Sequence, residues 1–93
     1  SFERAPVGLA HLLPDGRLQR LNATAAALLE VPADAAAGRP LLDLVHPDDR
    51  LPLLERLLAL VAGASETLEA EVRLHAPDRP ARWLRVVATL VRE

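Results

Sequence analysis

Residues 45–63 read VHPDDRLPLLERLLALVAG, and they contain the one long helical pattern of the chain. A helix is expected over about residues 50–62, with Asp49 as its N-cap and Gly63 closing it. Two adjacent apolar stripes run along this helix. The first consists of Leu51, Leu54, Leu58 and Val61, and the second of Leu53, Leu57 and Leu60. So wide an apolar surface predicts deep packing against a sheet rather than a narrow coiled-coil seam.

Two strands are predicted after this helix. Residues 68–75 alternate apolar and polar without exception, which is typical of a strand with one buried face. Residues 82–91 form the second strand, after a turn with two prolines. One face of it carries Trp83, Val87 and Val91. These three residues leave an apolar patch on the outer side of the sheet, and we expect an interface there.

A hairpin and three short helical segments are predicted before the long helix. Residues 7–13 and 17–21 flank Leu13-Pro14-Asp15-Gly16, which suits a type I turn. Asn22 is expected to N-cap a helix over residues 23–29. Shorter helical turns follow at residues 33–37 and 41–45. They are too short to be stable alone, so they must pack on a larger element.

The composition excludes several classes of protein. The 93 residues suit one domain, and the chain has no Cys and a net charge of −2 with acids and arginines interspersed. A nucleic-acid binder would show a basic patch instead. No run is apolar for long enough to span a membrane, and no signal peptide is evident, so we expect a cytoplasmic protein. The chain does not begin with Met, and we expect it to be a segment of a longer protein.

The ordered motifs resemble the PAS domain family over nearly the whole chain. They are Phe2 to Gly8, Asp15-Gly16-Arg17, Asn22-Ala23-Thr24-Ala25, Gly38-Arg39-Pro40, Val45-His46-Pro47-Asp48-Asp49-Arg50, Val72-Arg73-Leu74 and Arg82-Trp83-Leu84. The resemblance implies an α+β fold, a PAS-like antiparallel sheet with short helices and one long helix packed on one face. Glu30-Val31 and Asp78-Arg79 depart from the family, which usually has a Gly at the first place and Asp-Gly at the second.

The family's sheet has five strands in the order 2-1-5-4-3, and the fifth, central strand is missing from this chain. Residues 1–93 are therefore interpreted as a single PAS-like domain that is truncated at its C-terminus. Without that strand the two hairpins would each have an open edge. We expect either that the edges pair with another chain or that the first and fourth strands pair directly.

The resemblance implies a cavity between the sheet and the short helices. Its candidate lining residues are Leu12, Leu29, Leu42, Val45, Leu54, Leu58, Val72, Leu74, Val86 and Ala88. The alternative is that these residues are simply the core, and any ligand would be small and apolar. We expect no cofactor: LOV-type flavin and a thioester-linked chromophore both need Cys, and residues 50–62 offer no His for haem.

No catalytic or metal site is expected. Asp48 and Asp49 are interpreted as capping residues rather than as an acid–base pair. His46 is expected to tighten the turn before the long helix, His11 to lie within a strand, and His75 to be solvated.

The resemblance implies a sensory, signal-transducing domain rather than an enzyme. The expected parent is a larger bacterial protein, most readily a sensor histidine kinase of a two-component system, with a diguanylate cyclase or a transcriptional regulator as the alternatives. A ligand-free module for dimerisation or domain contact is the other interpretation. The expected partners are a second copy, through the sheet face or the open edges, and an output domain, with no nucleic acid and no membrane contact.

Overall fold

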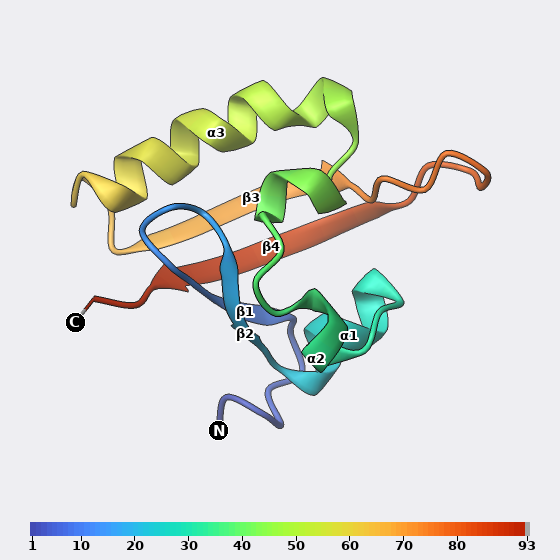
Figure 1. Ribbon diagram of the computed structural model, residues 1–93, viewed down its shortest axis with the longest axis horizontal. Helices are drawn as coiled ribbons and strands as arrows, with labels where there is room; N and C mark the ends of the chain where they lie inside the picture. Colours follow the sequence, from blue (N-terminus) through green and yellow to red (C-terminus); the bar gives the residue numbers. More distant parts are fainter. Residues whose placement is uncertain (93) are drawn as a thin grey trace.

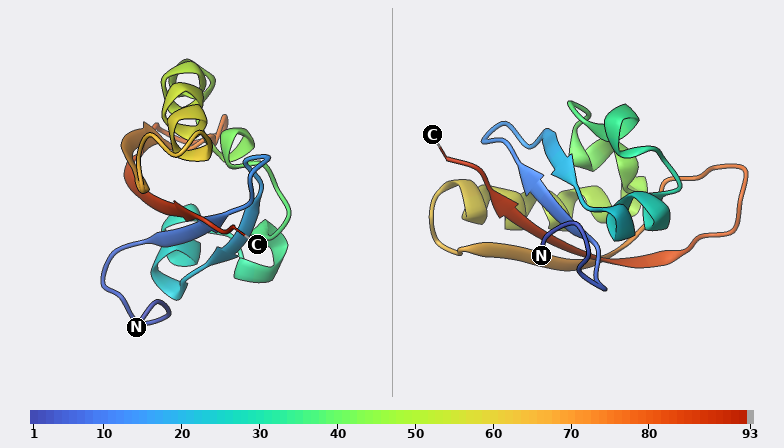
Figure 2. Two further views of the ribbon diagram at one scale, coloured as in Figure 1. Left: turned by 90° about the vertical axis from the view of Figure 1, so that its left-hand side faces the viewer. Right: turned by 90° about the horizontal axis from the view of Figure 1, so that it is seen from below.

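The computed structural model describes residues 1–92 and confirms the α+β class (Figure 1). The sheet has four strands in the order β2-β1-β4-β3. The strands are β1 (Leu9–Leu12), β2 (Leu18–Leu21), β3 (Thr67–Arg73) and β4 (Trp83–Leu90). The helices are α1 (Ala23–Leu29), α2 (Ala33–Ala36), the 3-10 helix η1 (Leu41–Leu44) and α3 (Pro47–Val61). In Figure 2, α3 lies along one side of the curved sheet. The short helices α1 and α2 lie at the opposite end of the molecule from α3.

Strands β1 and β4 pair directly, as one of the two alternatives predicted. Leu9 lies opposite Val87 and Leu12 opposite Leu90, and the amide of Val91 extends the ladder by donating to the Leu12 carbonyl at 2.8 Å. This pair is parallel, so the sheet is mixed and not antiparallel throughout as expected. A parallel pair needs a long crossover, which here contains β2, all the helices and β3.

The outer edge of β2 is covered by the chain itself. The amide of Gly38 donates to the Leu18 carbonyl at 2.7 Å, and the amide of Leu18 donates to the Arg39 carbonyl at 2.9 Å. The segment after α2 therefore satisfies the outward backbone groups at the start of β2, which an exposed edge would offer to another chain.

Side chains from α3 cap the outer edge of β3. The guanidinium of Arg56 donates to the Glu69 carbonyl at 2.9 Å, and the carboxylate of Asp49 accepts the amide of Arg73 at 2.8 Å. These contacts satisfy backbone groups toward each end of the strand. Only a short stretch around Glu71 is left for an added strand.

Helix α3 begins at Pro47, earlier than predicted, and the assignment of Asp49 as its N-cap is wrong. His46 is the cap, and its Nδ1 accepts the amide of Asp48 at 3.1 Å. Proline suits the first helical position because its φ is already helical and it has no amide to leave unpaired. Asp49 thus lies inside the first turn, where its carboxylate is free to reach β3.

Only one of the two apolar stripes of α3 faces the core. Leu53, Leu57 and Leu60 are buried, whereas Leu51 is 67% exposed and Leu58 59% exposed. The prediction that both stripes pack deeply is wrong for Leu51 and Leu58 of the first stripe, whereas Leu54 and Val61 are half-buried. A single helix on a sheet buries one side, and the most exposed of its leucines, Leu51 and Leu58, face away from the sheet.

Asn22 caps α1 as predicted. Its Oδ1 accepts the amide of Ala25 at 2.9 Å and also the amide of Leu9 at 2.9 Å. Its Nδ2 donates to the carbonyls of Phe2 and Val7. This fully buried side chain therefore joins the N-terminal segment, β1 and α1 at one point.

Candidate functional site

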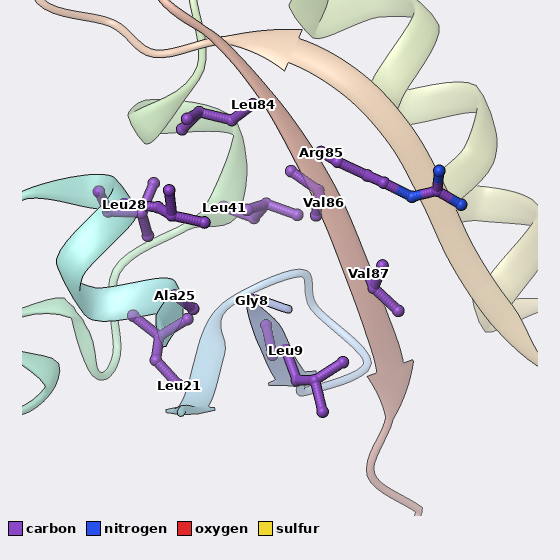
Figure 3. Close-up of a pocket in the computed structure, with 12 residues that line it drawn as sticks. Gly8, Leu9, Leu21, Ala25, Leu28, Leu41, Leu84, Arg85, Val86 and Val87 are labelled. Atoms are coloured by element: carbon purple, nitrogen blue, oxygen red, sulfur yellow. The ribbon is translucent and has the colours of Figure 1, made fainter. Parts of the chain in front are cut away.

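A small apolar cavity lies between α1, η1 and the central strands β1 and β4 (Figure 3). Its lining residues are Gly8, Leu9, Ala10, Leu21, Ala25, Leu28, Leu29, Leu41, Leu84, Arg85, Val86 and Val87. The only charged one is Arg85, whose guanidinium points away from the cavity in Figure 3 and pairs with Glu69 at 2.9 Å. The cavity wall is therefore apolar.

The cavity has a volume of about 40 Å³. A single water needs at least about 10–15 Å³, and ligand pockets measure about 300–1,000 Å³. No lining side chain places a polar group to orient a guest. The cavity is therefore much smaller than a typical ligand pocket.

The candidate pocket residues separate into groups in the structure. Two of them, Leu29 and Val86, line the cavity. The buried core holds Leu12, Val45, Val72 and Ala88. The half-buried residues away from the cavity are Leu42, Leu54 and Leu74.

The placement of Leu58 in the pocket is wrong, because its side chain is 59% exposed on the flank of α3. The cavity lies beside α1 rather than beneath α3, and helical periodicity alone does not distinguish these two positions. The prediction missed Leu28, Leu41 and Leu84. Leu84 could have been found, since it shares the inward face of β4 with Val86.

A larger apolar groove opens on the outer side of the molecule next to the cavity. It has a volume of about 230 Å³. The groove, called the Trp83 groove below, is lined by Pro6, Val7, Gly8, Leu28, Trp83, Leu84, Arg85 and Val87. Trp83 is 61% exposed and Val7 49% exposed. Of the predicted interface residues, Trp83 and Val87 lie in this groove, and Val91 is half-buried beyond its lining.

One side of the Trp83 ring is held against Arg73, whose guanidinium carbon lies 5.0 Å from the ring centroid. Arg73 is in turn fixed by Asp49, to which its side chain donates at 2.8 Å and 3.0 Å. These hydrogen bonds, with the amide of Arg73 and the cation's charge, lower the pKa of Asp49 to about 2. The start of α3, the end of β3 and the groove are thus connected through one ion pair.

Glu30 joins α1 to the loop between β3 and β4. It ends α1 in the left-handed region at φ 58°, a conformation that L-residues adopt at a cost. Its carboxylate pairs with Arg79 and Arg82 of the loop, and the Arg82 guanidinium also donates to the Leu28 carbonyl. The loop is therefore fastened beside the groove wall.

His46 and His75 line the same surface pocket, and His11 does not belong to it. His11 packs against the Phe2 ring at a centroid distance of 4.3 Å, His46 caps α3, and His75 is exposed. Within residues 1–92, no three His, Cys, Asp or Glu side chains gather as metal ligands. None of the helices in this part of the chain has the length and apolar character to cross a membrane.

Comparison with known proteins agrees with this architecture. No curated protein matches the chain. The family model described as the PAS fold matches residues 2–93, which is nearly the whole sequence. The chain belongs to the PAS fold family, a family of sensory and signalling domains.

Proposed function

We propose that this PAS domain relays signals through packing contacts at the Trp83 groove and not through a bound small molecule. The observation that carries the proposal is the contrast between a cavity of about 40 Å³ inside and a groove of about 230 Å³ outside. Exposed apolar surface of this kind is typical of a contact site.

Leu28 connects the groove to the interior. Its side chain belongs to the walls of both the groove and the cavity, as do Gly8 and Leu84. The approach is close: a Cβ on Gly8 would lie 3.3 Å from the Leu28 Cδ1 and 3.3 Å from the Ala25 Cβ. A partner side chain that presses on Leu28 would therefore act on Gly8, just before β1, through this close contact.

The proposed partner at the groove is the output domain of a larger bacterial protein, in which this domain has no catalytic role. We propose a cytoplasmic sensor histidine kinase as the parent, and no cofactor or nucleic acid as a partner. The next segment of the parent sequence decides its class. A phosphoacceptor-histidine helix supports the kinase, whereas a GGDEF motif indicates a diguanylate cyclase.

Native mass spectrometry of the freshly purified chain tests the ligand-free mechanism. We expect the mass of the polypeptide alone, because the cavity has room for little more than water. A reproducibly retained small molecule would contradict the proposal and favour a ligand sensor.

Substitution of Trp83 in the parent protein tests the groove. Trp83→Ala should change the basal output activity, while Trp83→Phe, which keeps an aromatic ring beside Arg73, should change it much less. Trp83 is 61% exposed, so neither variant should alter stability by more than about 0.5 kcal/mol. Equal output from both variants and the wild type would exclude the groove as the relay surface.

A further inference from the structure

Helix α3 carries an apolar stripe that the fold leaves partly uncovered. This outer stripe consists of Leu51, Leu54, Leu58 and Val61. Leu51 is 67% exposed and Leu58 59% exposed, while Leu54 and Val61 are half-buried. In the end-on view of Figure 2, α3 stands at the top of the molecule, and its outer side is free of the other elements of residues 1–92.

The spacing of the outer stripe suits a second helix. The intervals between its members are three, four and three residues, which is the a–d–a–d pattern of two heptads. The core-facing residues Leu53, Leu57 and Leu60 are buried on the sheet, and Val61 of the outer stripe also packs against the core. Leu51 and Leu58 are the members that the fold leaves for a partner.

Opposite charges border the outer stripe on its two sides. In the same heptads Arg50 takes a g position and Glu55 an e position. Arg50 donates through Nε to the Val45 carbonyl at 2.9 Å, which leaves its terminal nitrogens for another acceptor. Within residues 1–92, neither Arg50 nor Glu55 forms an ion pair.

We propose that this stripe packs against the same stripe of a second copy of the chain, with the two α3 helices parallel. In a parallel pair the g position of one helix faces the following e position of the other. Arg50 would therefore face the partner's Glu55, and the two-fold axis repeats this contact. An antiparallel pair that buries the same stripe would place Arg50 at the far end of the partner helix from Glu55, and this ion pair would be lost.

This surface is separate from the Trp83 groove and goes beyond the function proposed for it. None of the groove residues belongs to α3. A dimer formed through α3 thus leaves each groove free to contact an output domain.

Sedimentation equilibrium of the 93-residue chain, from about 10 μM to about 1 mM, tests the association. The wild type should show a concentration-dependent rise in mass toward the dimer. Leu58→Glu should raise the dissociation constant at least tenfold, because it places a charge in the seam. Since Leu58 is exposed, this variant should keep the wild-type circular dichroism spectrum.

Trp83→Glu is the matched control, and it should associate like the wild type. A wild type that stays monomeric to about 1 mM would overturn the proposal. The proposal would also be overturned if Trp83→Glu lost association while Leu58→Glu kept it. That result would show that the chain self-associates through the groove. The native mass spectrum that tests ligand-free relay does not depend on either result.

Two further variants test the pairing and its direction. Glu55→Arg should weaken association by opposing the partner's Arg50, and the charge exchange Arg50→Glu/Glu55→Arg should restore it. The chain has no native Cys, so Leu51→Cys should form a disulfide-linked dimer under mild oxidation, as adjacent a positions allow only in a parallel pair. Failure of the exchange to restore association, or of the disulfide to form in a dimer, would overturn the parallel arrangement.

Discussion

Gly16 occupies a position where a side chain would meet the core directly. It lies in the turn between β1 and β2 with φ +87°, and a Cβ placed there would be 2.9 Å from the Leu57 Cδ2. Leu57 is only 5% exposed and has little room to move. The turn needs glycine for its backbone conformation and also for its contact with α3.

We therefore expect Gly16→Ala to lower the free energy of unfolding by about 2 kcal/mol, from the positive φ and the overpacked contact together. Gly38→Ala is the control, because Gly38 has φ +83° but nothing within 4 Å of the added Cβ. It should lower stability by about 1 kcal/mol, from the backbone conformation alone. Urea denaturation measures the free energy of unfolding of both variants. Equal losses of stability would show that the contact with Leu57 does not contribute.

Single residues differ in how far their roles could be predicted. Asn22 was correctly predicted as a cap because capping depends on local sequence. Its further bonds to Leu9, Phe2 and Val7 were not predicted, since these residues reach it only through the tertiary fold. The sequence showed that Glu30 stands where the family usually has Gly. It did not show that Glu30 forms ion pairs with Arg79 and Arg82, which lie in a loop far along the chain.

At the scale of elements, Asp49 and Arg73 fasten the start of α3 to the end of β3. The side chain of Asp49 is 15% exposed and that of Arg73 24% exposed, so the pair is partly shielded from solvent. The pKa of Asp49 falls from 3.8 to about 2 because Arg73 stabilises the charged form. This stabilisation is present above pH 3.8 and is lost as the pH falls toward 2.

Asp49→Asn should thus lower stability by about 1.5 kcal/mol at pH 6, the scale of a charge-assisted hydrogen bond. The difference from wild type should shrink between about pH 4 and pH 2, as the wild-type carboxylate becomes protonated. Thermal denaturation over that range measures it. Asp48→Asn is the control, since Asp48 is 73% exposed and 3.9 Å from Arg73. If the loss of stability in Asp49→Asn did not depend on pH, the ion pair would be excluded as its cause.

The elements themselves were predicted well where one face is buried and the other is not. The alternation along residues 68–75 identified β3 because a strand turns successive side chains to opposite faces. The start of α3 was misplaced because several residues before it have side chains able to cap a helix, and only the structure shows which one accepts an amide.

At the scale of the whole molecule, the pairing of β1 with β4 joins the β1–β2 hairpin and the β3–β4 hairpin into a single sheet. The Cα radius of gyration is 12.3 Å, as a compact domain of this length should have at about 12 Å. The core is correspondingly continuous, and it takes residues from both hairpins and from α3.

Unfolding should therefore be a single transition. Trp83, the only Trp, reports on β4 through its fluorescence, while far-ultraviolet circular dichroism reports on all the elements. In a urea titration the two signals should coincide, because β4 lies at the centre of the sheet. A fluorescence change at lower urea than the circular dichroism change would mean that β3 and β4 unfold separately.

The sequence by itself determined the family, the order of the elements and the buried faces of the strands, because capping, turns and periodicity act over a few residues. Only the tertiary structure decided that β1 and β4 pair in parallel, that the cavity lies beside α1 and is small, and that one stripe of α3 remains exposed. Each of these depends on contacts between residues far apart in the chain. Such contacts follow from how all the elements share one core, which local patterns do not encode.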